Sequence, residues 1–190
     1  MKMPYLNFKS EYNRTPIIQI KKDDLDVYQG KQEILSELSQ IKTGIVVFET
    51  YPGIDLDVLK KDIIQPLRPH QIINIENYSK SELEINQMLN KNITDDRVFG
   101  LISHHTIEDF YQMDKIKILN QDLQASKELI VVYGFGASLI KGNKLIHVSL
   151  TRWEIQLRYR TGTSNFKIHN PNEDILRKYK RGFFIEWRVA

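Results

Sequence analysis

Short apolar runs alternate along this chain with stretches of helical periodicity, and no other feature constrains the fold as strongly. The apolar runs are predicted to form strands at residues 45–48, 71–75, 98–103, 129–133 and 145–150. Helical patterns accompany them at residues 31–41, 55–64, 79–91, 109–126 and 151–160. Because helices of this length between strands form βαβ crossovers, the strands should be parallel. We therefore predict an α/β fold, a three-layer αβα arrangement around a mainly parallel sheet of about five strands.

Local signals set the ends of several predicted helices. Gly44 follows the first helical pattern, at a position where glycine commonly ends a helix. Asp55 or Asp57 can cap the second helix, and Thr151 can cap the last, since their side-chain oxygens accept hydrogen bonds from first-turn N–H groups. The helix over residues 109–126 is expected to break near Met113.

The composition excludes several classes of protein. The sequence contains no cysteine, so disulfides, thiolate metal sites, iron–sulfur clusters and cysteine nucleophiles are excluded. No apolar run approaches the roughly 18 residues that span a bilayer, and the first residues lack the core of a signal peptide. We expect a cytoplasmic protein with no membrane partner. Its length predicts a single domain over residues 1–190, with an N-terminal arm over 1–30 and a basic segment over 151–190.

Positive charge is concentrated in that basic segment. Residues 151–190 carry nine Lys or Arg and four Asp or Glu, a net charge of +5, whereas the preceding residues carry −2. This asymmetry predicts an anionic ligand or an acidic partner near the segment, or else a solvated basic face. Nucleic acid is not expected, because the predicted strands lack the aromatic and basic alternation that supports base stacking.

The sequence FETYPGID (48–55) has the strand, glycine-containing turn and helix start of a phosphate-binding loop. In such loops backbone N–H groups hold phosphate, a Lys side chain contacts the outer phosphates of the nucleotide, and a Ser or Thr hydroxyl holds magnesium. The helix start after Gly53 has neither, and Asp55 and Asp57 would repel phosphate. The segment is therefore a degenerate phosphate loop or a simple βα turn. Tyr51 and Gly53 are its candidate ligand-binding residues.

The segment Ser103-His-His-Thr106 follows a predicted strand and precedes Glu108 and Asp109. Adjacent histidines after a strand point to opposite sides, so they would not readily chelate one ion, and no metal site is predicted. A loop at the carboxyl end of a strand is instead a common place for ligand contacts. His104 is therefore a candidate ligand-binding residue.

Three arginines occupy the helix predicted after the last strand, in the sequence TRWEIQLRYR (151–160). Guanidinium groups in such a position can bind phosphate bidentately, which makes Arg152, Arg158 and Arg160 candidate phosphate contacts. The alternative is a basic exposed face with ion pairs such as Glu154–Arg158.

The strings YPGID, TDDRVFG, VVYGFGA, RWEIQLRYR and LRKYKRGFFIEWRVA resemble the N-terminal region of a bacterial group of class I mannose-6-phosphate isomerases. The resemblance runs from near Tyr51 to Ala190 and is strongest over residues 151–190. It implies a domain that precedes a cupin-type isomerase domain, in which His, Glu and Gln hold zinc. Since none of those ligand motifs occurs in this sequence, the resemblance assigns it no cofactor and no catalytic residue. The remaining pattern is similar to a nucleoside kinase that has lost its phosphate-binding lysine.

We therefore expect a non-catalytic domain, phospho-ligand-binding or structural, of a mannose-6-phosphate isomerase-like protein, whose parent reaction converts mannose 6-phosphate to fructose 6-phosphate. The alternative is a kinase-like phosphotransferase with a degenerate phosphate loop. Expected partners are the protein's own cupin domain beyond Ala190, a phosphorylated small molecule and a second copy of the chain. The homodimer prediction rests on the apolar side chains of Phe183, Phe184 and Trp187.

Overall fold

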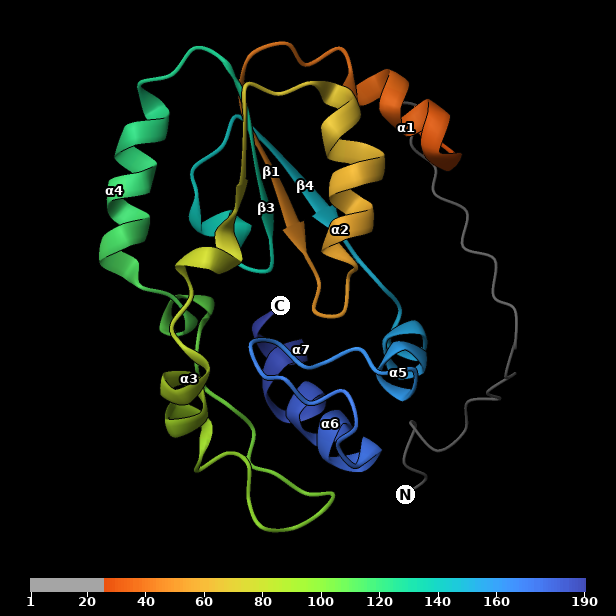
Figure 1. The fold of residues 1–190 in the computed structure, drawn as a ribbon, viewed down its shortest axis with the longest axis vertical. Helices are drawn as coiled ribbons and strands as arrows, with labels where there is room; N and C mark the ends of the chain where they lie inside the picture. Colours follow the sequence, from red (N-terminus) through yellow and green to blue (C-terminus); the bar gives the residue numbers. More distant parts are fainter. Residues whose placement is uncertain (1–25) are drawn as a thin grey trace, which may run out of the picture.

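The computed structural model describes residues 26–190, in which four parallel strands form a central sheet (Figure 1). β1 (Gly44–Thr50) and β3 (Leu129–Gly134) lie in the middle. β2 (Gln71–Asn74) pairs with the outer side of β3, and β4 (Lys144–Val148) pairs with the outer side of β1. The predicted α/β fold with a parallel sheet is confirmed, with four strands in place of about five.

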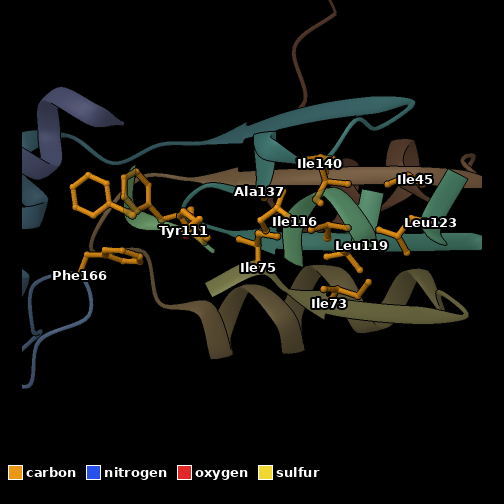
Figure 2. Packing of buried hydrophobic residues seen from close by; sticks show 14 of the residues in the cluster. Ile45, Ile73, Ile75, Tyr111, Ile116, Leu119, Leu123, Ala137, Ile140 and Phe166 are labelled. Atoms are coloured by element: carbon orange, nitrogen blue, oxygen red, sulfur yellow. The ribbon is translucent and has the colours of Figure 1, made fainter. Parts of the chain in front are cut away.

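The two faces of the sheet carry separate apolar cores, because alternate residues of a strand point to opposite faces. On one face Ile45 and Val47 of β1 join the cluster shown in Figure 2, to which α3 (Glu82–Leu89) and α4 (Met113–Gln124) contribute. On the other face Val46 and Phe48 pack with residues of α1 (Gly30–Leu38) and α2 (Leu56–Leu59). Helices therefore cover both faces, and the fold is the three-layer αβα arrangement.

Side-chain caps begin two of the helices where the sequence predicts them. Asp55 accepts hydrogen bonds from two first-turn N–H groups of α2, at 3.0 and 2.9 Å. Thr151 accepts the Glu154 N–H at 3.2 Å and caps α5 (Arg152–Arg160). The break expected near Met113 falls slightly earlier, at Tyr111, where the backbone is extended after a 3₁₀ turn, η5 (Ile107–Phe110).

The predicted strand over residues 98–103 is wrong. This segment forms hydrogen bonds outside the sheet: the Leu101 N–H donates to the Asn92 carbonyl at 2.9 Å, and the Ser103 N–H donates to the Phe184 carbonyl at 2.8 Å. The side chain of Phe99 is 69% exposed. A short apolar run does not by itself distinguish a buried strand from an apolar surface segment, and here the run borders the C-terminal helices.

The C-terminal segment folds beyond the carboxyl ends of the strands (Figure 1). It comprises α6 (Ile175–Arg181), a π-helical turn, η7 (Gly182–Glu186), and α7 (Trp187–Val189). Trp187 is buried against Ile155 and Tyr159 of α5, whereas Phe183 stays exposed. No helix within residues 26–190 is long and apolar enough to cross a membrane. Most of the arm predicted over residues 1–30 lies outside the described residues.

The two sides of α4 should differ sharply in their response to truncation. Ile116→Ala should lower the free energy of unfolding by about 2–5 kcal/mol, because Ile116 is 1% exposed within the core. Ile118→Ala removes the same atoms from a side chain that is 58% exposed, so its effect should stay within about 0.5 kcal/mol. Urea unfolding followed by circular dichroism measures both. Equal losses for the two variants would contradict this orientation of α4.

Candidate ligand-binding cleft

The carboxyl ends of β1 and β3 meet at a topological switch point. From β1 the chain leads past β3 to β2, and from β3 it leads past β1 to β4 at the opposite edge. Neighbouring strands whose chains leave in opposite directions open a crevice at their carboxyl ends, where α/β proteins bind ligands. Tyr51 and Gly53 lie in the loop after β1, and Phe135 lies in the loop after β3.

Carboxylates of the protein occupy backbone donors at this crevice. Glu49, in β1, accepts hydrogen bonds from two N–H groups of the loop after β3, at 2.7 and 2.6 Å. Glu76, which follows β2, accepts the Phe135 N–H at 3.1 Å. Asp55 holds the first-turn N–H groups of α2. Donors of the kind that hold phosphate in such loops therefore have anionic partners within the protein.

Two adjoining cavities form a polar cleft beside this crevice. The inner cavity, of about 150 Å³, lies between the loops that follow β1 and α5. The outer cavity, of about 480 Å³, continues past the end of β2. Glu76, Ser164 and Lys167 line both cavities, and Lys80 and His169 line the outer one. We refer to the two cavities together as the cleft.

The backbone fixes the position of Lys167 in the cleft. Its φ of 53° lies in the left-handed region, which costs a side-chain-bearing residue about 1–2 kcal/mol. The preceding residue, Phe166, is buried, with its ring centroid 4.9 Å from that of Phe135 and 6.3 Å from that of Tyr111. The anchored aromatic ring holds the loop and so determines where Lys167 enters the cleft.

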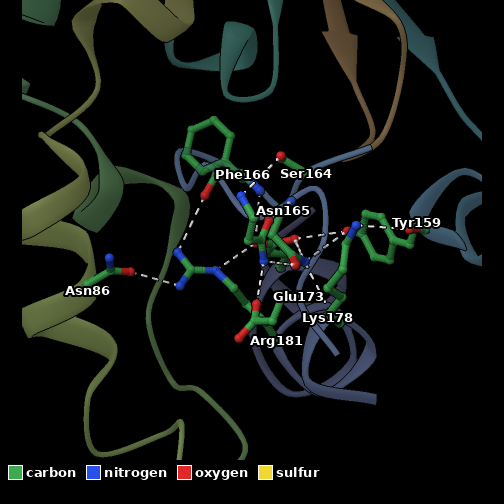
Figure 3. Close-up of polar contacts among 10 residues, drawn as sticks. Asn86, Tyr159, Ser164, Asn165, Phe166, Glu173, Lys178 and Arg181 are labelled. Atoms are coloured by element: carbon green, nitrogen blue, oxygen red, sulfur yellow. Dashed lines mark hydrogen bonds and ion pairs between the residues drawn. The ribbon is translucent and has the colours of Figure 1, made fainter. Parts of the chain in front are cut away.

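A buried polar network supports the same loop (Figure 3). Asn165 donates to one carboxylate oxygen of Glu186 at 3.0 Å, and the Phe166 N–H donates to the other at 3.0 Å. Arg181 pairs with this carboxylate at 3.0 Å, and the two side chains are only 5% and 1% exposed. Arg181 also donates to Asn86 of α3 at 2.9 Å. A fully satisfied network of this kind restricts the loop to one geometry.

Lys178 of α6 is a further charged side chain buried in this region. Its Nζ donates to the Tyr159 carbonyl at 2.9 Å and to the Pro171 carbonyl at 3.3 Å. Burial lowers the pKa of Lys178, and the charge of Glu173 opposes that change. The Lys178 ammonium group thus donates its hydrogen bonds to backbone carbonyls of the protein.

The charges of Glu76 and Lys167 act on each other across the cleft. Burial raises the pKa of Glu76 above its usual 4.5, while the Phe135 N–H and the positive charge of Lys167 oppose the rise and Glu49 adds to it. Among residues 26–190, no ion pair at or below 4.0 Å joins Glu76 to Lys167. The two opposite charges therefore line one cleft without forming a direct ion pair.

Four of the six predicted ligand residues meet near the loop after β1. Tyr51 and Gly53 line the inner cavity. Arg158 donates to the Gly53 carbonyl at 3.0 Å and forms the expected ion pair with Glu154 at 2.8 Å. Arg152 lies beside the Tyr51 hydroxyl: burial raises the pKa of Tyr51, and this guanidinium opposes the rise. Arg158 therefore joins α5 to the loop.

The other two predicted residues lie outside the cleft. Arg160 donates from Nε to the Tyr179 hydroxyl at 2.7 Å, and its guanidinium lies 5.7 Å from the centroid of the Trp153 ring. His104 is exposed in the segment before η5 and does not line the cleft. In the described part of the chain, no three His, Cys, Asp or Glu side chains gather in a way that could hold a metal ion.

Sequence reasoning did not single out Glu76 or Lys167. Glu76 lies in a 3₁₀ turn, η4 (Ile75–Tyr78), directly after a predicted strand, and this position was a usable signal. Lys167 follows Phe166, an isolated aromatic residue in a polar loop, which is a weaker signal. Their proximity comes from segments far apart in the sequence, so no spacing rule could have revealed it.

A comparison with family models gives a match over residues 30–190 to a family described as Domain of unknown function (DUF8485). The match includes all four strands and all residues that line the cleft. No curated protein and no solved structure matches the chain.

Loss of the Glu186 carboxylate should destabilise the domain severely. Glu186→Ala leaves the Arg181 guanidinium buried without its counter-ion, which should lower the free energy of unfolding by about 3–5 kcal/mol. The matched control is Glu154→Ala, which removes the partner of Arg158 from a partly exposed pair and should cost at most about 1 kcal/mol. Urea unfolding compares the two. A small effect of Glu186→Ala would show that the buried pair is dispensable.

Glu76 should make stability depend on pH. Because its pKa is higher in the folded chain than its usual 4.5, the contribution of Glu76 to stability is lost as pH rises from 4.5 through the raised value. Glu76→Gln keeps an acceptor for the Phe135 N–H but does not titrate, so it should gain stability relative to the wild type across that window. Urea unfolding of both proteins from pH 4 to 8 measures the difference. A difference that is constant with pH would contradict the raised pKa.

Proposed function

The chain belongs to the family described as Domain of unknown function (DUF8485), and we propose from its cleft that it is a non-catalytic domain that binds a phosphorylated small molecule. The separation of Lys167 from Glu76 across the cleft carries the proposal. On this proposal the parent protein is mannose-6-phosphate isomerase-like, and the ligand is a sugar phosphate. The isomerisation and its zinc then belong to a cupin domain outside these residues.

A sugar phosphate offers the groups that the cleft lacks. Its phosphate can accept hydrogen bonds from the ammonium groups of Lys167 and Lys80, and its hydroxyls can donate to Glu76. Ser164 accepts the Asn170 N–H at 3.2 Å, and its own O–H donates to no other group among residues 26–190. The outer cavity, at about 480 Å³, falls within the range of small-molecule sites. Charge and hydrogen-bonding capacity therefore favour an anionic, polyhydroxylated ligand.

The kinase-like alternative has less support from the same region. Phosphoryl transfer requires positive charge around the transferred phosphate, supplied by a lysine and a metal ion. Here the carboxylates of Glu49 and Asp55 hold backbone donors at the carboxyl edge of the sheet. These negative charges would repel a triphosphate. The arrangement therefore favours binding without phosphoryl transfer.

Isothermal titration calorimetry tests the proposal. Mannose 6-phosphate or fructose 6-phosphate should bind, whereas unphosphorylated mannose and ATP with magnesium should not. Lys167→Asn should weaken sugar-phosphate binding about tenfold or more, because a hydrogen bond to a charged group contributes about 1.5–3 kcal/mol. Asparagine tolerates the left-handed backbone at this position, so the loop should keep its conformation.

Lys141→Asn provides the matched control, since Lys141 is exposed and does not line the cleft. This variant should bind as the wild type does. If neither sugar phosphate binds, or if Lys167→Asn binds with unchanged affinity, the proposed site is wrong. Binding of ATP that requires magnesium would instead support the kinase-like alternative.

A further inference from the structure

An apolar groove lies on α6, η7 and α7, apart from the cleft. Its cavity of about 310 Å³ shares no lining residue with the cleft. The lining is largely aromatic and apolar, with side chains that include Val98, Phe99, Tyr179, Phe183, Phe184 and Trp187. Three segments therefore meet here: residues 98–99, which were expected to form a strand, α5 through Gln156, and the C-terminal helices.

Large apolar side chains remain exposed in and beside this groove. Phe99 is 69% exposed and Phe183 is 49% exposed within it, and Leu101 and Ile102 continue the same exposed segment. Trp153 of α5, which Arg160 covers, is 62% exposed. Large apolar side chains left exposed around one groove of a folded domain are a common mark of an interaction site.

Two arginines lie on the aromatic rings around the groove. The guanidinium of Arg152 is 5.8 Å from the ring centroid of Phe183 and 5.7 Å from that of Trp187. The guanidinium of Arg160 is 5.7 Å from the ring centroid of Trp153. Within the part of the chain that the structure describes, neither guanidinium has a carboxylate within 4.0 Å. The groove therefore combines an apolar floor with positive charges that lack counter-ions among these residues.

We propose that this groove docks an acidic segment of a partner protein, one that inserts a large apolar side chain and places Asp or Glu beside Arg152 and Arg160. The large apolar side chain of the partner would fill the cavity lined by Phe99 and Phe183, and its burial would contribute to the affinity. Asp or Glu side chains of the partner would pair with the two guanidinium groups, so the two surfaces would be complementary in charge. This inference goes beyond the proposed ligand site and does not depend on it.

The charge of the groove favours an acidic partner over a second copy of the chain. A two-fold dimer would bring the grooves of both copies, with Arg152 and Arg160 of each, into one interface, and the groove lining offers Lys180 but no Asp or Glu to pair with these arginines. Like charges opposed across an interface are unfavourable. A single-stranded nucleic acid is also less suited, because the guanidinium groups already lie over the rings of Phe183, Trp187 and Trp153 on which bases would stack.

Selection of peptides from a phage-displayed library of random dodecapeptides tests the proposal on the full chain. Enriched peptides should combine a large apolar residue with Asp or Glu, and their binding in fluorescence polarisation should weaken as salt is added. Phe99→Ser and Arg160→Gln should each weaken the best peptide about tenfold or more. Both side chains are exposed, so neither change should unfold the domain.

Leu145→Ser and Arg177→Gln are the matched controls, because Leu145 is 62% exposed on β4 and Arg177 lines a different cavity. Both should bind the peptide as the wild type does. The proposal is overturned if no peptide is enriched, if enriched peptides are basic, or if they bind the two groove variants normally. It is equally overturned if the chain self-associates in sedimentation and Phe99→Ser abolishes that association, which would assign the groove to a second copy. Binding of an oligo-dT strand that Phe99→Ser abolishes would likewise assign the groove to a single-stranded nucleic acid.

Discussion

The buried ion pair between Arg181 and Glu186 is the interaction on which the rest of this structure depends. Removing two charges from water is costly, and the cost is offset only when every remaining donor and acceptor has a partner. Glu186 meets that condition by accepting from Arg181, Asn165, Tyr159 and the Phe166 N–H. Since these donors come from α5, the loop after it and α6, one carboxylate holds the segment from α5 to η7 together.

Both proposed binding surfaces depend on this network. The Phe166 N–H bond to Glu186 fixes the loop that carries Lys167, and Lys167 forms one wall of the cleft. The same carboxylate belongs to η7, the turn that also contains Phe183 of the groove. Cleft and groove are therefore formed by two sides of one C-terminal unit, which the Arg181–Asn86 hydrogen bond attaches to α3.

The sequence predicted the sheet best where burial leaves no alternative. The runs that became β1 and β3 are almost wholly apolar, and both strands are buried on both faces, as parallel central strands must be. The caps Asp55 and Thr151 were also predictable, because a cap depends on residues only two or three positions away. The apolar run at 98–103 misled the prediction, since its composition suits a strand but its neighbours in space are the C-terminal helices.

By itself the sequence determined the fold class, the absence of cysteine chemistry and the lack of the lysine and hydroxyl that a phosphate-binding loop needs after Gly53. These features follow from local composition and periodicity. Only the tertiary structure decided that Glu76 and Lys167 share one cleft, that Arg158 bonds to Gly53 and that Arg160 lies on Trp153. The physical reason is that each of these pairings depends on how helices and loops pack on the sheet. Packing of that kind depends on the whole buried core rather than on any single segment.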